Sequence, residues 1–237
     1  MNNSIEGDFY FGISDNKIYI SFFDSIKNNL RNTVSFQIPD NLNNDLNFKI
    51  ILNLLQNNIK KIERELGSFL NSGYISIHSK TYQKILISIK NIFDEKKLDK
   101  NVVTNLVQRS LQQFNINNNK LSIVHIIINK YIIDDKIYDF FPGHIQFKKI
   151  ILELEFICLD KNLVDKIKKL FKDCKVHINK IISFQYSQKL FKSNYEDVTM
   201  CVSARRLINE RNKSEVHINE ISPRNPALFD KIFNLFD

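Results

Sequence analysis

The histidine, glutamate and cysteine residues are those whose side chains could bind a metal or carry out acid–base or nucleophilic chemistry. The five histidines are His78, His125, His144, His177 and His217. They have neither an HExxH motif nor the paired spacing of zinc ligands. His125 stands inside an apolar run, where a hydrogen-bonded core or edge histidine is more common than a ligand. Glu153 and Glu155 alternate with apolar residues, which predicts the solvent face of a strand rather than an acid–base pair.

The cysteine usage and the N-terminus indicate a cellular compartment. Cys158, Cys174 and Cys201 are an odd number with no CxxC spacing, which fits a reducing compartment better than a disulfide framework. No signal-peptide pattern opens the chain, and no segment approaches ~18 uninterrupted apolar residues. The sequence therefore predicts a cytosolic protein that is at most peripheral to a membrane.

Length and charge leave several classes of protein open. With 237 residues and 43% hydrophobic content, the chain can bury a substantial core. Its formal charge of +8 suits an acidic partner such as nucleic acid or anionic lipid. Lysine, asparagine and isoleucine are abundant together, however, and this bias is typical of AT-rich genomes. Because no ribonucleoprotein-type motif is present, nucleic-acid binding is kept only as an alternative.

The first third of the chain predicts a hairpin, a strand and a helix. Residues 8–14 and 17–23 are apolar runs around a short polar turn, which indicates a β-hairpin. Residues 33–38 predict a third strand. From Phe48, apolar residues recur every three or four positions until Gly67, which predicts a helix that ends there.

The middle of the chain predicts strands, two capped helices and a central block over residues 121–190. Two strands and a charged turn, DEKKLDK, precede a helix that Asp99 can cap. Two long β-branched runs then flank Pro142-Gly143, and Asp160 caps a helix whose lysines are interpreted as a solvated face. The predicted strands are residues 73–79, 82–93, 122–134, 146–159 and 178–184.

The end of the chain predicts a short strand pair and an amphipathic helix. The strands are residues 198–202 and 215–221, and Asn225-Pro226 then begins the helix. Its apolar residues share one face, opposite the polar ones. Three interpretations stay open: docking on the protein's own body, an interfacial membrane anchor, or insertion into a partner's groove. The predicted membrane-binding or partner-binding residues are Leu228, Phe229, Ile232, Phe233, Leu235 and Phe236.

Three features of the central block carry a resemblance to a known family. His125 precedes an apolar run, Asp134-Asp135 follows that run, and Pro142-Gly143 marks the next turn. This pattern resembles a segment of the bacterial cell-division protein FtsA, and the resemblance extends over roughly residues 9–190. In that family a strand-helix-strand-strand unit is inserted in an actin-like ATPase and serves protein contacts. The loop after Pro142-Gly143 is shorter here than in the family and lacks its further glycine.

The resemblance allows a test for ATPase chemistry. Actin-like ATPases hold phosphates with two glycine-containing hairpin loops, because only glycine lets backbone N–H groups approach the phosphate closely. At the first loop, Gly12 takes the usual place of the acidic residue and Ser14 that of the glycine, with Asp15 a poor substitute. The second loop is expected near Cys201, but all five glycines lie before that point. The resemblance therefore implies a truncated relative that binds no nucleotide, cofactor or metal.

The predicted fold class is α+β, a partial actin-like (ribonuclease H-like) sheet with an inserted strand-helix-strand-strand subdomain. The predicted division is 1–66, a degenerate actin-like part; 67–175, the inserted subdomain; 176–222, return strands; and 223–237, the terminal helix. The function that the resemblance implies is a non-catalytic scaffold of bacterial division. Its expected partners are an FtsZ-type tubulin homologue or another FtsA-like chain, together with an anionic membrane surface. An actin-like ATPase completed by a partner chain is the enzymatic alternative.

Overall fold

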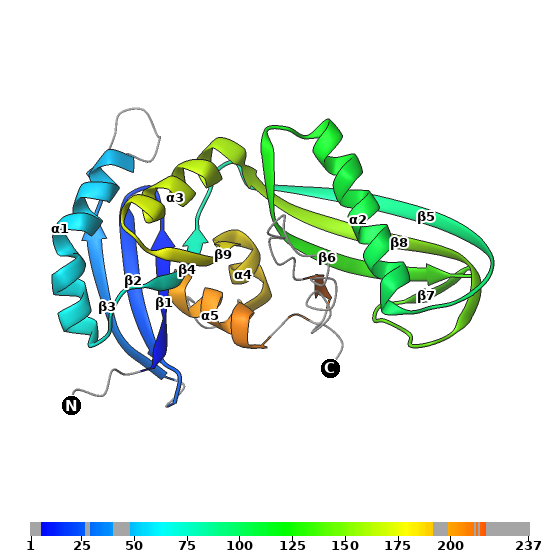
Figure 1. The fold of residues 1–237 in the computed structure, drawn as a ribbon, viewed down its shortest axis with the longest axis horizontal. Helices are drawn as coiled ribbons and strands as arrows, with labels where there is room; N and C mark the ends of the chain where they lie inside the picture. Colours follow the sequence, from blue (N-terminus) through cyan, green and yellow to red (C-terminus); the bar gives the residue numbers. More distant parts are fainter. Residues whose placement is uncertain are drawn as a thin grey trace. The chain divides into compact units, whose positions relative to one another are not determined.

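The chain divides into two compact units, each with its own sheet (Figure 1). The computed structural model describes residues 6–26, 29–39, 48–191, 199–210, 212 and 214–216. Unit 1 is Met1–Tyr82 with Leu159–Glu210, and unit 2 is Gln83–Cys158 with Arg211–Asp237. The predicted inserted subdomain, residues 67–175, extends beyond the segment Gln83–Cys158 at both ends. One strand of the predicted range belongs to the sheet of unit 1, and one helix packs on that sheet.

Unit 1 is built on a five-stranded sheet in the order β3-β2-β1-β4-β9. β1 (Gly7–Ile13), β2 (Lys17–Asp24) and β3 (Asn29–Gln37) pair antiparallel, as the hairpin pattern predicts. β4 (Ser72–Ile77) is parallel to β1, and β9 (His177–Ser183) is parallel to β4. This order and these directions are those of a ribonuclease H-like sheet, so the predicted fold class is confirmed.

Helices cover both faces of this sheet (Figure 1). α1 (Phe48–Leu66) and α3 (Lys161–Asp173) contact each other on one face, where the ring of Phe171 lies 4.8 Å from that of Phe11. α4 (Phe184–Phe191) and α5 (Met200–Glu210) contact each other, and α5 packs on β1, β2 and β4. Successive residues of β1 point to opposite faces of the sheet. Every residue from Phe9 to Ile13 is buried. The central strand is thus apolar on both sides.

Unit 2 begins with a strand, a helix and a strand, but its first strand is not the predicted one. The predicted strand-helix-strand-strand unit begins with the strand near Tyr74, which belongs to the sheet of unit 1 as β4. The sheet of unit 2 has the order β10-β6-β8-β5, and β7 forms a hairpin with β6. The turn of that hairpin holds Asp134 and Asp135, both with positive φ, which is the backbone conformation of a type I′ turn. The elements are β5 (Gln83–Lys97), α2 (Lys100–Asn117), β6 (Leu121–Ile133), β7 (Lys136–Tyr138), β8 (Gln146–Asp160) and β10 (Glu215–Val216).

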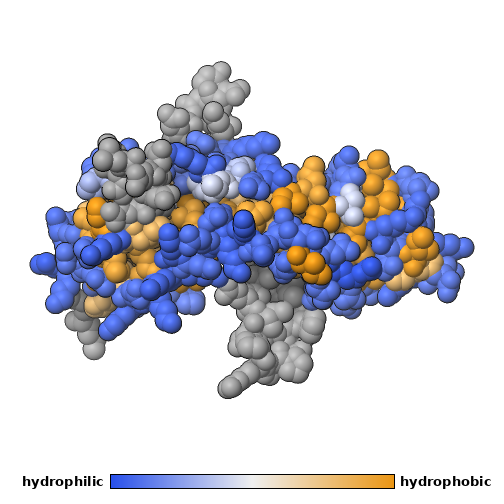
Figure 2. Space-filling view, turned by 90° about the horizontal axis from the view of Figure 1, so that it is seen from above, coloured by the Kyte–Doolittle hydropathy of each residue, from blue (hydrophilic) through white to orange (hydrophobic). Residues whose placement is uncertain are grey.

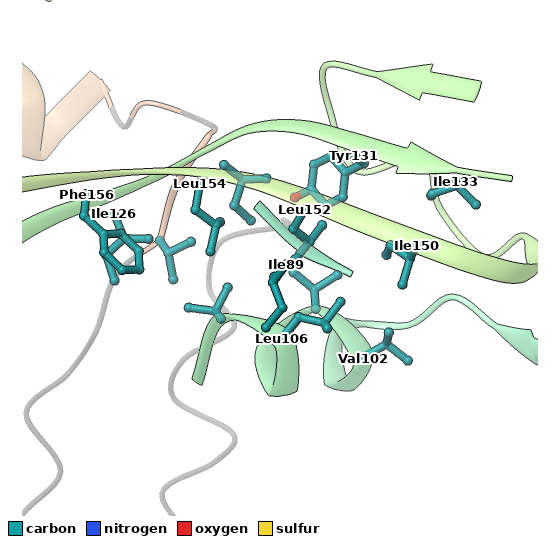
Figure 3. Close-up of a cluster of buried hydrophobic side chains, with 14 of the residues drawn as sticks. Ile89, Val102, Leu106, Ile126, Tyr131, Ile133, Ile150, Leu152, Leu154 and Phe156 are labelled. Atoms are coloured by element: carbon teal, nitrogen blue, oxygen red, sulfur yellow. The ribbon is translucent and has the colours of Figure 1, made fainter. Parts of the chain in front are cut away.

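The core of unit 2 lies between α2 and one face of its sheet (Figure 3). Val102 and Leu106 of α2 point toward Ile89, Leu152 and Leu154 of the strands. Each of these side chains is at most 4% exposed, and full burial of one contributes roughly 1.5–3 kcal/mol. The alternation along β8 therefore fixes which face of the sheet receives the helix.

The two predicted helix caps are confirmed. The carboxylate of Asp99 accepts a hydrogen bond from the backbone N–H of Val102 at 2.9 Å, which caps α2. The carboxylate of Asp160 accepts one from the N–H of Leu163, also at 2.9 Å, and caps α3. The lysines of α3 are exposed, in agreement with a solvated face. These two aspartates fix the points at which each chain segment turns from strand to helix.

Two predicted segments are wrong. The charged turn DEKKLDK is mostly strand, because β5 runs on to Lys97 after its register against β8 shifts between Ile92 and Lys96. The strand predicted over residues 198–202 is replaced by helix α5 from Met200 onward, whose buried Met200, Ala204 and Leu207 recur at helical spacing. Glu215–Val216 does form a strand, but it pairs with β6.

Candidate functional site

The carboxyl ends of the parallel strands β1, β4 and β9 meet at one edge of the sheet of unit 1. Open α/β sheets bind ligands at this edge, so the side chains there are the candidates for a ligand site. The strands are in register there, since Ile13 pairs with Ile77 and Ile77 with Ser183. The polar side chains that follow the strand ends are Ser14, Asp15, His78, Ser79, Lys80, Ser183 and Gln185.

Most of the polar groups at this edge bond to one another. The Asp15 carboxylate lies 3.0 Å from the Lys80 ammonium, and both side chains are about half exposed. The Gln185 side chain donates to the carbonyl of Ser79 and lies near its N–H. The Ser79 hydroxyl lies 2.9 Å from that of Thr81. An exposed ion pair of this kind stabilises a fold by at most about 1 kcal/mol, and one carboxylate paired with a lysine is a structural arrangement rather than a metal site.

Gly12 serves the packing of a helix. A Cβ atom at Gly12 would lie 2.8 Å from the Cβ of Met200 at the start of α5, closer than such atoms normally approach. The expected phosphate loop after it is a tight turn closed on itself. The Ser14 N–H donates to the carbonyl of Lys17 at 3.0 Å, and the Ser14 hydroxyl donates to the same carbonyl. The glycine therefore allows α5 to approach β1 closely.

The expected place of the second phosphate loop, near Cys201, is occupied by helix α5. The Cys201 thiol is 2% exposed and donates to the carbonyl of Tyr10 at 3.3 Å. The Ser203 hydroxyl lies 3.1 Å from that of Ser187 on α4, and both are buried. Small side chains thus bring α4, α5 and the sheet close together. Sequence reasoning missed this role because Cys201 falls in the strand predicted over residues 198–202, and no helix was predicted at Ser187 or Ser203.

His125 is a buried, hydrogen-bonded residue, as predicted. Its Nδ1 atom lies 2.8 Å from a carboxylate oxygen of Glu215, and the two side chains are 0% and 1% exposed. Glu215 was not identified from the sequence, because nothing in the pattern links residues 90 positions apart. Among the described residues, no cluster of three or more histidine, cysteine, aspartate or glutamate side chains is placed to hold a metal ion.

The acidic turn of the family resemblance has a structural role here. The Asp134 carboxylate accepts hydrogen bonds from the backbone N–H groups of Lys148 and Lys149, at 2.8–3.2 Å. The N–H of Asp134 donates to the carbonyl of Lys149. These bonds tie the end of β6 to β8. Glu153 and Glu155 lie, as predicted, on the face of β8 opposite the core, and Glu155 forms an ion pair with Lys84 of β5.

β5 carries two of the large apolar side chains that are exposed in the described part of unit 2. Leu86 is 72% exposed and Ile92 is 64% exposed, and both lie on the face of the sheet opposite α2. Lys84 and Lys90 share that face. Figure 2 shows apolar side chains among hydrophilic ones on the face of the molecule that is seen from above. Among the described features of unit 2, this strand is the candidate for a protein contact, because two large apolar side chains are exposed on one face of an edge strand.

The six residues predicted to bind a membrane or a partner, Leu228 to Phe236, lie outside the described residues. Among the residues that are described, no helix is both long enough and apolar enough to span a membrane.

Comparison with known proteins shows similarity only to solved structures. No family model matches the chain, and no curated protein matches it. One similar structure is the PilM-PilN type IV pilus biogenesis complex, with 9% identity and a TM-score of 0.46 over 77% of this chain and 49% of that one. The chain thus spans about half the length of that solved structure.

Two further structures are similar at the same level. A Bacteroides thetaiotaomicron protein with an actin-like ATPase fold and unknown function has 12% identity and a TM-score of 0.33, over 79% of this chain and 56% of that one. The cytoplasmic domain of EpsL, an inner membrane component of the type II secretion system of Vibrio cholerae, has 8% identity and a TM-score of 0.38. That match covers 77% of this chain and 57% of the EpsL domain.

The buried cysteines give a first prediction. Burial raises the pKa of Cys201 to about 11 and that of Cys158 to about 12, and it raises the pKa of Cys174 to about 11 with a contribution from Asp173. Because the thiolate is the reactive form, the folded protein at pH 8 should react very slowly with iodoacetamide, and all three thiols should react in denaturant. Peptide mass spectrometry measures this. Rapid labelling of Cys201 in the folded protein would contradict the packing of α5 on β1.

Proposed function

We propose that this chain is a non-catalytic scaffold that binds protein partners through unit 2. The observation that carries the proposal is β5, a long strand with Leu86 and Ile92 exposed on a face where α2 does not cover the sheet. Unit 1 then acts as a platform, and unit 2 is inserted in its chain between Tyr82 and Leu159. Its sheet supplies rigidity, since apolar side chains and helices pack on both faces.

The chemistry of unit 1 supports a role without catalysis. The turn at Ser14 to Lys17 is closed by its own hydrogen bonds, and helix α5 occupies the place of the second expected loop. Gly12 contacts Met200 and so is used for packing. An enzyme of the actin-like class needs two backbone loops that point N–H groups at phosphates. The residues of this chain at those places close a turn or pack a helix instead.

The resemblance to FtsA suggests the setting of the scaffold. We propose that it works in the bacterial division machinery, with an FtsZ-type tubulin homologue or another FtsA-like chain as partner. The proposed location is the cytoplasm, with peripheral attachment at the inner membrane. The amphipathic stretch from Leu228 to Phe236 is the proposed attachment, because burial of several leucine and phenylalanine side chains at roughly 1.5–3 kcal/mol each suffices for reversible binding.

Photo-crosslinking tests the partner-binding role of β5. A photoreactive phenylalanine at Leu86 or Ile92, in the protein expressed in its own cells, should give crosslinks to another protein chain. The matched control is the same amino acid at Ile26, which is 82% exposed on unit 1. Crosslinking from β5 no stronger than from Ile26 would refute the proposed contact surface. Any captured chain, including a second copy of this one, supports it.

Flotation with anionic vesicles tests the proposed attachment. The full chain should rise with the vesicles, and a chain ending at Ser222 should stay in the dense fraction, because the six apolar residues are then missing. Neutral vesicles serve as the control for charge. If both chains stay in the dense fraction, the terminal stretch does not bind lipid, and the attachment part of the proposal is wrong.

A further inference from the structure

β5 is an edge strand with a long unpaired side. Twelve of its fifteen residues pair with β8, and no strand in the described part of the chain pairs with its other side. An edge strand presents backbone N–H and C=O groups that can pair with another chain. Proteins guard such edges with lysines and bulges, and β5 carries Lys84, Lys90 and a register shift after Ile92. The lysines and the register shift disfavour most pairings with another strand, but one register of pairing accommodates them.

We propose that β5 pairs antiparallel with β5 of a second copy, around a two-fold axis at Ile89. This inference rests on the proposed role of unit 2 as a contact surface and names its partner as the same chain. A two-fold dimer requires antiparallel edges, since each residue must contact its counterpart reciprocally. With the axis at Ile89, Leu86 lies opposite Ile92 of the second copy, and Ile92 lies opposite its Leu86.

This register covers the exposed apolar side chains of β5. Leu86 and Ile92 both lie on the face opposite α2, so the two cross-strand pairs form there. Residues 86–92 of β5 pair with β8 without a register shift, so this part of the strand is regular. On the same face Lys90 lies opposite Ser88, and beyond the shift Asp94 comes near Lys84. The lysine therefore gains a second carboxylate beside that of Glu155, with which it already forms an ion pair.

Neighbouring registers are less favourable. An axis at Lys90 places that lysine against its own copy and Lys84 against Lys96, and like charges directly opposite are destabilising. An axis at Ser88 places Leu86 against Lys90 and Ile92 against Lys84, so the apolar pairs are lost. An axis between two residues places core-facing side chains opposite solvent-facing ones. Charge and apolar pattern thus both select the axis at Ile89.

The first test is the mass of the protein in solution. The full chain, of 28.0 kDa, should show a concentration-dependent approach to twice that mass by light scattering or sedimentation equilibrium. Leu86→Lys should weaken the dimer by about tenfold or more, because both symmetric apolar pairs become lysine contacts. Ile116→Lys, at a residue of α2 that is 81% exposed, should leave it unchanged. A protein that stays monomeric at all concentrations would overturn the inference and leave the scaffold proposal to its own crosslinking test.

The second test reads the register. Leu86→Cys protein mixed with Ile92→Cys protein should form a disulfide-linked heterodimer under mild oxidation, because opposite residues of an antiparallel pair bring their Cβ atoms within ~5.5 Å. Neither variant alone should crosslink, and Leu86→Cys mixed with Ile116→Cys should not either. The three native cysteines are buried and do not compete. Crosslinking of Leu86→Cys with itself, or none in the mixture, would show that the proposed pairing is wrong.

Discussion

The parallel pairing of β4 with both β1 and β9 is the constraint on which the rest of the fold depends. β4 and β9 lie about a hundred residues apart in the chain, yet Ser72 pairs with His177 and Ile77 with Ser183. The segment between them must therefore leave the sheet and return to it. The structure meets this requirement with antiparallel strands, since Gln83 at the start of β5 pairs with Cys158 near the end of β8. Unit 2 can then be inserted without breaking the sheet of unit 1.

The topology of this sheet does not depend on the loops at its strand ends. Ligand binding at the strand ends depends on loops, whereas the sheet depends on buried side chains and backbone pairing. Here a short turn and a packed helix stand where loops would be, and Gly12 admits Met200 to the surface of the sheet. The buried core of unit 1 maintains the fold, and the proposed contact surface lies on unit 2.

Sequence reasoning succeeded where local physics decides the structure. The hairpin, the caps at Asp99 and Asp160, and the helix beginning at Phe48 each depend on residues within a few positions of one another. It failed where distant residues decide. The partner of His125 is Glu215, α5 is helical because the sheet buries its apolar stripe, and β5 extends through charged residues because β8 continues beside it. The candidate contact strand was visible in sequence as alternation, but its edge position follows only from the topology.

Nucleotide binding tests the central claim most directly. The full chain would be unfolded thermally with and without a large excess of magnesium and ATP, and binding of the same ligand would be followed by calorimetry. A ligand that binds the folded state raises the unfolding temperature according to its concentration relative to Kd. The structure predicts no change in unfolding temperature and no saturable heat. A clear rise in unfolding temperature with saturable binding would show that a phosphate site exists, and would contradict the account of unit 1 as a platform without catalysis.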